Sequence, residues 1–236
     1  MDPRRLLGCS AGLGRGCALW RALAALALAF LGAMECDAVR AAELALRVRQ
    51  ANGQPLARAV VMLHALDHPA APPAPIRATI DQIDRTFVPD VLVIPVGSSV
   101  SFPNTDKVRH QVYSFSSAHR FQLPLYSGKP YPPERFDRMG IVTLGCNIHD
   151  SMLAYIVVTD AELVGSTDAR GIWVHADVAR GRYRLELWHP RLRDPASTLK
   201  REVTVSEGER MELPITLDQA LRPGALAPHP HSWDSY

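Results

Sequence analysis

The chain has 236 residues, of which 47% are hydrophobic and 21% charged, a composition typical of one large globular domain or two small ones. Residues 1–41 hold five of the 26 basic and three of the 24 acidic side chains, which leaves 21 of each in the remainder. This neutral remainder has no dense stripe of Lys and Arg, which argues against a nucleic-acid partner.

Residues 1–41 have the pattern of an export signal. A basic start is followed by the apolar stretch RALAALALAFLGAM and then by small residues, with Val39 and Ala41 at the positions expected for a cleavage site. The apolar stretch is shorter than the roughly 20 residues that a membrane span needs, so cleavage is favoured over a single membrane anchor. We therefore expect a mature protein that begins near Ala42, is exported to the periplasm and has no membrane span.

The rest of the chain is predicted to be all-β, because short β-rich runs are divided by Gly, Pro, Asn and Asp, as in β-sandwiches. In chain order, strands are expected at 44–50, 57–66, 90–97, 98–104, 109–115, 140–146 and 153–160, with two more within 166–190 and two within 199–217. The other segments are predicted to be a proline-rich connector at 68–76, a long surface loop at 116–140 and a flexible tail at 219–236.

The cysteines are distributed unevenly. Cys9, Cys17 and Cys36 lie in the predicted signal, so the mature protein would carry Cys146 alone. Exported proteins pair their cysteines or avoid them, and a single remaining one indicates an intermolecular disulfide, a buried inert thiol, or a reactive or metal-bound thiolate.

The neighbours of Cys146 favour a metal. In the predicted strand GIVTLGC, side chains alternate between faces, so Cys146 shares the inward face with Val142 and Leu144. His149 and Met152 follow at intervals of three residues, so one short loop delivers a thiolate, an imidazole and a thioether. A second imidazole is available from His110 in the upstream strand. Two His, one Cys and a weak axial Met form the blue-copper ligand set.

The stretch GCNIHDSM, with a His upstream, resembles the copper loop of the cupredoxins, and its Cys-x2-His-x2-Met spacing is that of amicyanins. The resemblance covers residues 76–160 and extends to plastocyanin-like proteins of the "methylamine utilization protein" type. It implies a Greek-key β-sandwich that holds one type 1 copper, with His110, Cys146 and His149 as equatorial ligands and Met152 as the axial one. The chain departs from the family at Gln111, where many cupredoxins have an Asn that ties the two copper loops together.

The flanking segments resemble a different module. The stretches NGQPLARAVVMLHA and GRYRLELWHP are similar to parts of a carboxypeptidase regulatory-like β-sandwich of transthyretin type. We expect residues 43–67 and 161–218 to form this second small sandwich, with the cupredoxin segment inserted between its strands or tightly tandem with it. Such modules usually bind or stabilise rather than catalyse.

The expected function is that of an exported one-electron carrier and not of an enzyme. The resemblance implies that electrons pass through His149 and that a cytochrome or dehydrogenase partner docks there transiently. Candidates to flank that surface are Leu123, Pro124, Leu125 and Tyr126.

Several alternatives stay open at this point. The protein could deliver copper rather than carry electrons, or it could be a metal-free binding module in which Cys146 is structural. Zinc is a competitor because Asp150 could complete a tetrahedral site. A cysteine hydrolase using Cys146 with His110 or His149 is the enzyme alternative. Among the other histidines, His119 is expected to be surface decoration, and His189 to hold a strand end through a hydrogen bond.

Overall fold

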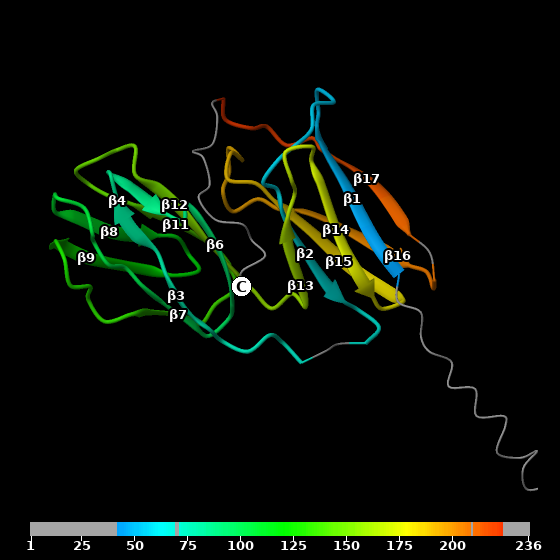
Figure 1. Cartoon of the computed structure of the whole chain (residues 1–236), viewed down its shortest axis with the longest axis horizontal. Helices are drawn as coiled ribbons and strands as arrows, with labels where there is room; N and C mark the ends of the chain where they lie inside the picture. Colours follow the sequence, from blue (N-terminus) through cyan, green and yellow to red (C-terminus); the bar gives the residue numbers. More distant parts are fainter. Residues whose placement is uncertain (1–41, 69–70, 209, 224–236) are drawn as a thin grey trace, which may run out of the picture. The chain divides into compact units, whose positions relative to one another are not determined.

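The computed structural model describes residues 42–68, 71–208 and 210–223, and the regular elements in these ranges are β-strands (Figure 1). The all-β class predicted from the sequence is therefore confirmed. Within the described ranges, no helix has the length and hydropathy needed to cross a membrane. The predicted signal, residues 1–41, and residues 224–236 lie outside the described residues.

The first sandwich carries the predicted metal ligands. Its five-stranded sheet has the order β6-β12-β11-β8-β9, and its smaller sheet has the order β10-β7-β3. The larger sheet consists of β6 (Val91–Pro95), β12 (Leu153–Thr159), β11 (Gly140–Gly145), β8 (His110–Phe115) and β9 (Arg120–Tyr126). The smaller sheet consists of β10 (Glu134–Phe136), β7 (Ser98–Ser101) and β3 (Arg77–Thr79), and a separate hairpin is formed by β4 (Asp81–Ile83) and β5 (Thr86–Val88).

Alternating side chains form the core of the first sandwich. Val112 on β8 and Leu144 on β11 are fully buried, and they pack in one cluster with Val100 on β7 and Phe136 on β10. Burial of one face of each sheet accounts for the alternating sequence pattern of β8 and β11. The same cluster contains Cys146, as the alternation predicted.

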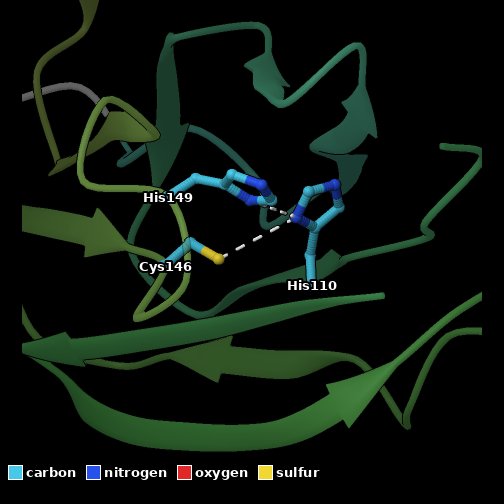
Figure 2. Close-up of side chains that lie close together, drawn as sticks. All are labelled: His110, Cys146 and His149. Carbon is cyan, nitrogen blue, oxygen red and sulfur yellow. Dashed lines mark hydrogen bonds between the residues drawn. The ribbon is translucent and has the colours of Figure 1, made fainter. Parts of the chain in front are cut away.

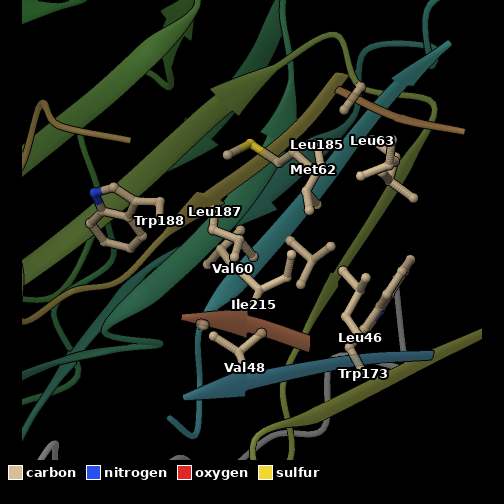
Figure 3. Packing of buried hydrophobic residues seen from close by; sticks show 14 of the residues in the cluster. Leu46, Val48, Val60, Met62, Leu63, Trp173, Leu185, Leu187, Trp188 and Ile215 are labelled. Atoms are coloured by element: carbon tan, nitrogen blue, oxygen red, sulfur yellow. The ribbon is translucent and has the colours of Figure 1, made fainter. Parts of the chain in front are cut away.

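The second sandwich is built from the two ends of the described chain. One sheet, of order β14-β1-β17, consists of β14 (Ile172–Val178), β1 (Ala42–Gln50) and β17 (Met211–Leu217). The other, of order β13-β2-β15-β16, consists of β13 (Leu163–Ser166), β2 (Val60–Ala65), β15 (Gly181–Trp188) and β16 (Leu199–Val205). Figure 3 shows the core between them, where Leu46 and Ile215 from one sheet pack with Leu63 and Leu185 from the other.

Strand β12 is buried on both faces and joins the two cores. Ile156 belongs to the core of the first sandwich, whereas Tyr155 and Val157 belong to the core of the second. The Tyr155 ring lies edge-on to Trp188 of β15, with centroids 5.1 Å apart. Two-sided burial explains why the sequence of this strand is a continuous apolar run instead of an alternating one.

The prediction of a long loop at 116–140 is wrong, because this segment contains β9 and β10. Pro124 makes the first of these strands, β9, hard to recognise from the sequence. It lies on an edge strand, within a register shift where His110 pairs with Tyr126 and Val112 pairs with Leu123. Proline lacks the N–H that a regular ladder needs, and it is tolerated at such an edge irregularity.

Two further expectations also need correction. Leu123 and Tyr126 are buried in the first sandwich and do not form a surface patch, although Pro124 and Leu125 are exposed. The tail does not begin at 219, because the Gln219 side chain donates to Ser197 Oγ and the Arg222 guanidinium donates to the Pro190 carbonyl.

The sequence analysis did not predict the short strands β3, β4, β5 and β13, since three or four residues give little periodicity.

Candidate metal centre

Three predicted ligands are brought together at one end of the first sandwich. His110 is the first residue of β8, Cys146 directly follows β11, and His149 lies in the connection to β12. Neighbouring strands β8 and β11 are antiparallel, and Gly145 pairs with Tyr113. This pairing brings His110 next to Cys146 although 36 positions separate them in the chain. In Figure 2 the three side chains point toward one another.

The donor atoms are close enough to share one ion. Cys146 Sγ lies 3.9 Å from His110 Nδ1, which in turn lies 3.2 Å from His149 Nδ1. One ligand atom from each of the three residues lies within 4.8 Å of the other two. Among the described residues, this is the one group of at least three His, Cys, Asp or Glu side chains that meets this criterion. His110 and Cys146 are buried, and His149 is half-buried.

Met152, the predicted axial ligand, is buried in the same apolar cluster as Cys146, with an exposure of 2%. Its backbone N–H donates to the His149 carbonyl over 2.9 Å, which closes a turn between the two residues just before β12 begins. The short loop from Cys146 to Met152 is therefore fixed at both ends by strands of one sheet.

The second ring nitrogen of His110, Nε2, points away from the donor group and contacts an acidic residue that the sequence analysis did not identify. His110 Nε2 lies 2.9 Å from Asp106 Oδ2. Hydrogen bonds from His110 and from the backbone N–H of Arg85 lower the pKa of the Asp106 carboxyl to about 2. The only signal in the sequence is an acidic residue four positions before the histidine, which is too common to be informative alone.

Gln111, at the position where many cupredoxins have an Asn, also links the two ligand-bearing segments. Gln111 Oε1 accepts a hydrogen bond of 2.7 Å from Asn147 Nδ2. These residues directly follow His110 and Cys146, so this amide bridge joins the two ligand-bearing segments. At Gly145, a Cβ atom would lie 2.7 Å from the end of the Tyr113 side chain, so a larger residue before Cys146 would require that side chain to move.

The other candidates lie outside the group of donors. Asp150 is exposed and does not belong to it, so the structure gives zinc no fourth ligand there. His119 Nε2 lies 3.1 Å from Glu134 Oε2, and its ring packs on Phe136. His189 hydrogen-bonds to the Ala57 carbonyl at the end of β15, as predicted.

The residues present fit a bound copper ion. The group contains a soft sulfur and two imidazole nitrogens, it is largely shielded from water, and the two nitrogens face each other across 3.2 Å. Copper in both of its common oxidation states accepts this combination of ligands. Core packing alone does not account for two imidazole nitrogens within 4.8 Å of the buried Cys146 sulfur.

No protein-family model and no curated protein sequence matches the chain. Among solved structures, a purple cupredoxin from Nitrosopumilus maritimus is 23% identical with a TM-score of 0.31, over 35% of this chain and 99% of that one. An amicyanin variant in its reduced Cu(I) form is 19% identical with a TM-score of 0.33, over 35% and 82%. A copper-containing nitrite reductase from Thermus scotoductus is 26% identical with a TM-score of 0.33, over 48% and 28%. The case for a metal centre in this chain therefore rests on its donor geometry.

Proposed function

We propose that this chain is an exported copper protein that carries single electrons between redox partners and does not turn over a substrate. The observation that carries the proposal is the close group of Cys146 Sγ, His110 Nδ1 and His149 Nδ1, in which Cys146 and His110 are buried and His149 is half-buried. In this reading the three residues hold one type 1 copper, with Met152 as a weak axial ligand. When bound, copper would supply a one-electron couple between Cu(I) and Cu(II).

The protein contributes rigidity and exclusion of water. His110 and Cys146 are attached to paired strands, and the Gln111–Asn147 amide bridge joins the segments that follow them. A set of ligands that cannot rearrange between oxidation states keeps the reorganisation small, and this favours fast electron exchange. Burial of Cys146 at 3% exposure also protects the thiolate from side reactions.

The half-buried His149 is the proposed route for electrons. Ile148, beside it in the same loop, has 51% exposure, and Val108, two residues before His110, has 43%. These apolar side chains replace the buried Leu123 and Tyr126 as candidates for a small docking surface. A cytochrome or dehydrogenase partner would bind there transiently, through a contact of low area. Export to the periplasm is proposed from the pattern of residues 1–41.

The alternative of copper delivery requires a site that opens and exchanges metal readily. Full burial of His110 and near-complete burial of Cys146 favour retention of the metal instead. The second sandwich, whose segments resemble a carboxypeptidase regulatory-like module, would then have a stabilising role, because it shares β12 with the copper-bearing half.

The proposal is tested by loading the purified protein with Cu(II) and recording its visible and paramagnetic resonance spectra. We expect an intense visible band that ascorbate bleaches, that Cys146→Ala abolishes, and that Met152→Leu retains with a shifted reduction potential. His119→Ala is the matched control, because this histidine lies in the same sandwich but outside the donor group. A colourless protein with stoichiometric zinc would contradict the proposal, and rapid loss of copper to a weak chelator would favour delivery.

A further inference from the structure

Both oxygens of the Asp106 carboxylate have hydrogen-bond partners. Its Oδ2 accepts a hydrogen bond of 2.7 Å from the Arg85 backbone N–H and contacts His110 Nε2, while its Oδ1 accepts one of 2.6 Å from the Lys107 N–H. The Asp106 backbone N–H donates to Asn104 Oδ1 over 3.0 Å. The side chain is 10% exposed.

The β4–β5 hairpin supplies much of this support. Its two-residue loop has positive φ at Asp84 (48°) and Arg85 (58°), as the tight primed hairpin turns require. This turn presents the Arg85 N–H to Asp106. On the first strand of the hairpin, Asp81 accepts hydrogen bonds from the backbone N–H and the hydroxyl of Thr105. The segment that precedes His110 is therefore fixed by an element remote from the donor group.

The contact with Asp106 determines which nitrogen of His110 carries the proton. An ionised carboxylate only accepts hydrogen bonds, so at 2.9 Å the proton between the two groups belongs to His110 Nε2. A neutral imidazole protonated at Nε2 has a bare lone pair at Nδ1. That atom is the one that faces Cys146 Sγ and His149 Nδ1.

The inner neighbours of His110 are consistent with the same tautomer. Cys146 carries an S–H in its thiol form, and His149 is able to carry a proton on Nδ1, so each of these neighbours offers a donor to His110 Nδ1. In the metal-free protein, His110 Nδ1 then accepts on the inner side while Nε2 donates to Asp106 on the outer side. Every polar atom of this fully buried ring has a partner.

We propose that Asp106 is the positioning residue of the centre, whose carboxylate fixes His110 in the Nε2–H tautomer and thereby aims a bare Nδ1 at the metal position. The role in metal binding rests on the proposed function, whereas the tautomer is a property of the metal-free chain. Outer carboxylates that orient metal-bound histidines also make them better donors, and their loss typically weakens metal binding about 10- to 100-fold.

The first test uses metal-free protein labelled with ¹⁵N-histidine, in which nitrogen chemical shifts report the tautomer. We expect His110 of the wild type to be protonated at Nε2 with Nδ1 bare. Asp106→Asn keeps an acceptor of the same shape and should retain this tautomer, whereas Asp106→Ala should populate the Nδ1–H form. The matched control is Asp84→Asn, which removes a charge from the exposed turn of the same hairpin and should change nothing.

The second test measures the Cu(II) dissociation constant and the reduction potential of the loaded proteins. Asp106→Ala should weaken Cu(II) binding about 10- to 100-fold. Asp106→Asn should raise the potential, because loss of the negative charge disfavours the more positive Cu(II) state. Asp84→Asn should leave both quantities close to wild type.

The proposal is overturned if wild-type His110 carries its proton on Nδ1, or if Asp106→Ala keeps both the wild-type tautomer and the wild-type affinity. If Asp106→Ala does not fold, the wild-type tautomer still decides the matter, because a proton on Nδ1 of His110 overturns the proposal, and an unchanged potential in Asp106→Asn also counts against it. If the wild type binds no copper, the proposed function fails, but the tautomer measurement continues to test the role of Asp106.

Discussion

Acid should destabilise this protein through His189, at the end of β15. His189 is 1% exposed, and its Nε2–H donates to the Ala57 carbonyl while its Nδ1 accepts from the Arg191 N–H, both over 3.1 Å. This arrangement suits only the neutral ring. Burial, with a smaller effect from the positive charges of Arg191 and Arg58, lowers the pKa of His189 from 6.5 to about 4.

The sign and size of the effect follow from this pKa. Because the folded state holds the proton less tightly than the unfolded state, the contribution of His189 is fully present above about pH 6.5 and is lost as the pH falls toward 4. Each pKa unit corresponds to about 1.4 kcal/mol, so moving from about pH 7.5 to about pH 5 should remove about 2 kcal/mol from the free energy of unfolding.

The assay is urea unfolding of the metal-free protein at these two pH values, for the wild type and for His189→Gln. Glutamine keeps an N–H donor for the Ala57 carbonyl but does not titrate. Other groups contribute equally to both proteins, so the wild type should lose about 2 kcal/mol more than the variant. Equal losses in the two proteins would show that His189 is not the group responsible.

Two substitutions test the fold and the rigidity of the centre. Gly171→Ala should cost about 3 kcal/mol in urea unfolding, because φ is +74° and the new Cβ would lie 2.4 Å from the Val48 carbonyl oxygen. Gly53→Ala has a similar φ of +81° without a neighbour within 4 Å, and an equal loss there would refute the clash. Gln111→Ala breaks the exposed amide bridge to Asn147 and should cost about 1 kcal/mol or less. It should also speed loss of copper to a chelator severalfold, and an unchanged rate would mean that the bridge does not hold the two segments together.

Local patterns in the sequence were sufficient to predict which residues of one strand and one loop lie near the candidate metal centre. Alternation in GIVTLGC implied that Cys146 points into the core, and the spacing of the short loop that follows placed His149 and Met152 near it. These inferences hold because they involve neighbours in one strand and one loop. The all-β class was predictable for the same reason, since strand alternation and turn residues act over a few positions.

The tertiary structure decided everything that depends on which strands pair. His110 and His119 lie close together in the sequence, yet only His110 joins the donor group, because β8 is the strand next to β11. Asp106 was not foreseeable, since its contacts come from a separate hairpin with no distinctive sequence. The strand at 120–126 was missed because Pro124 is compatible with an edge strand only where the register shifts. Pairing and register are set by the packing of distant segments, which the spacing of residues along the chain does not encode.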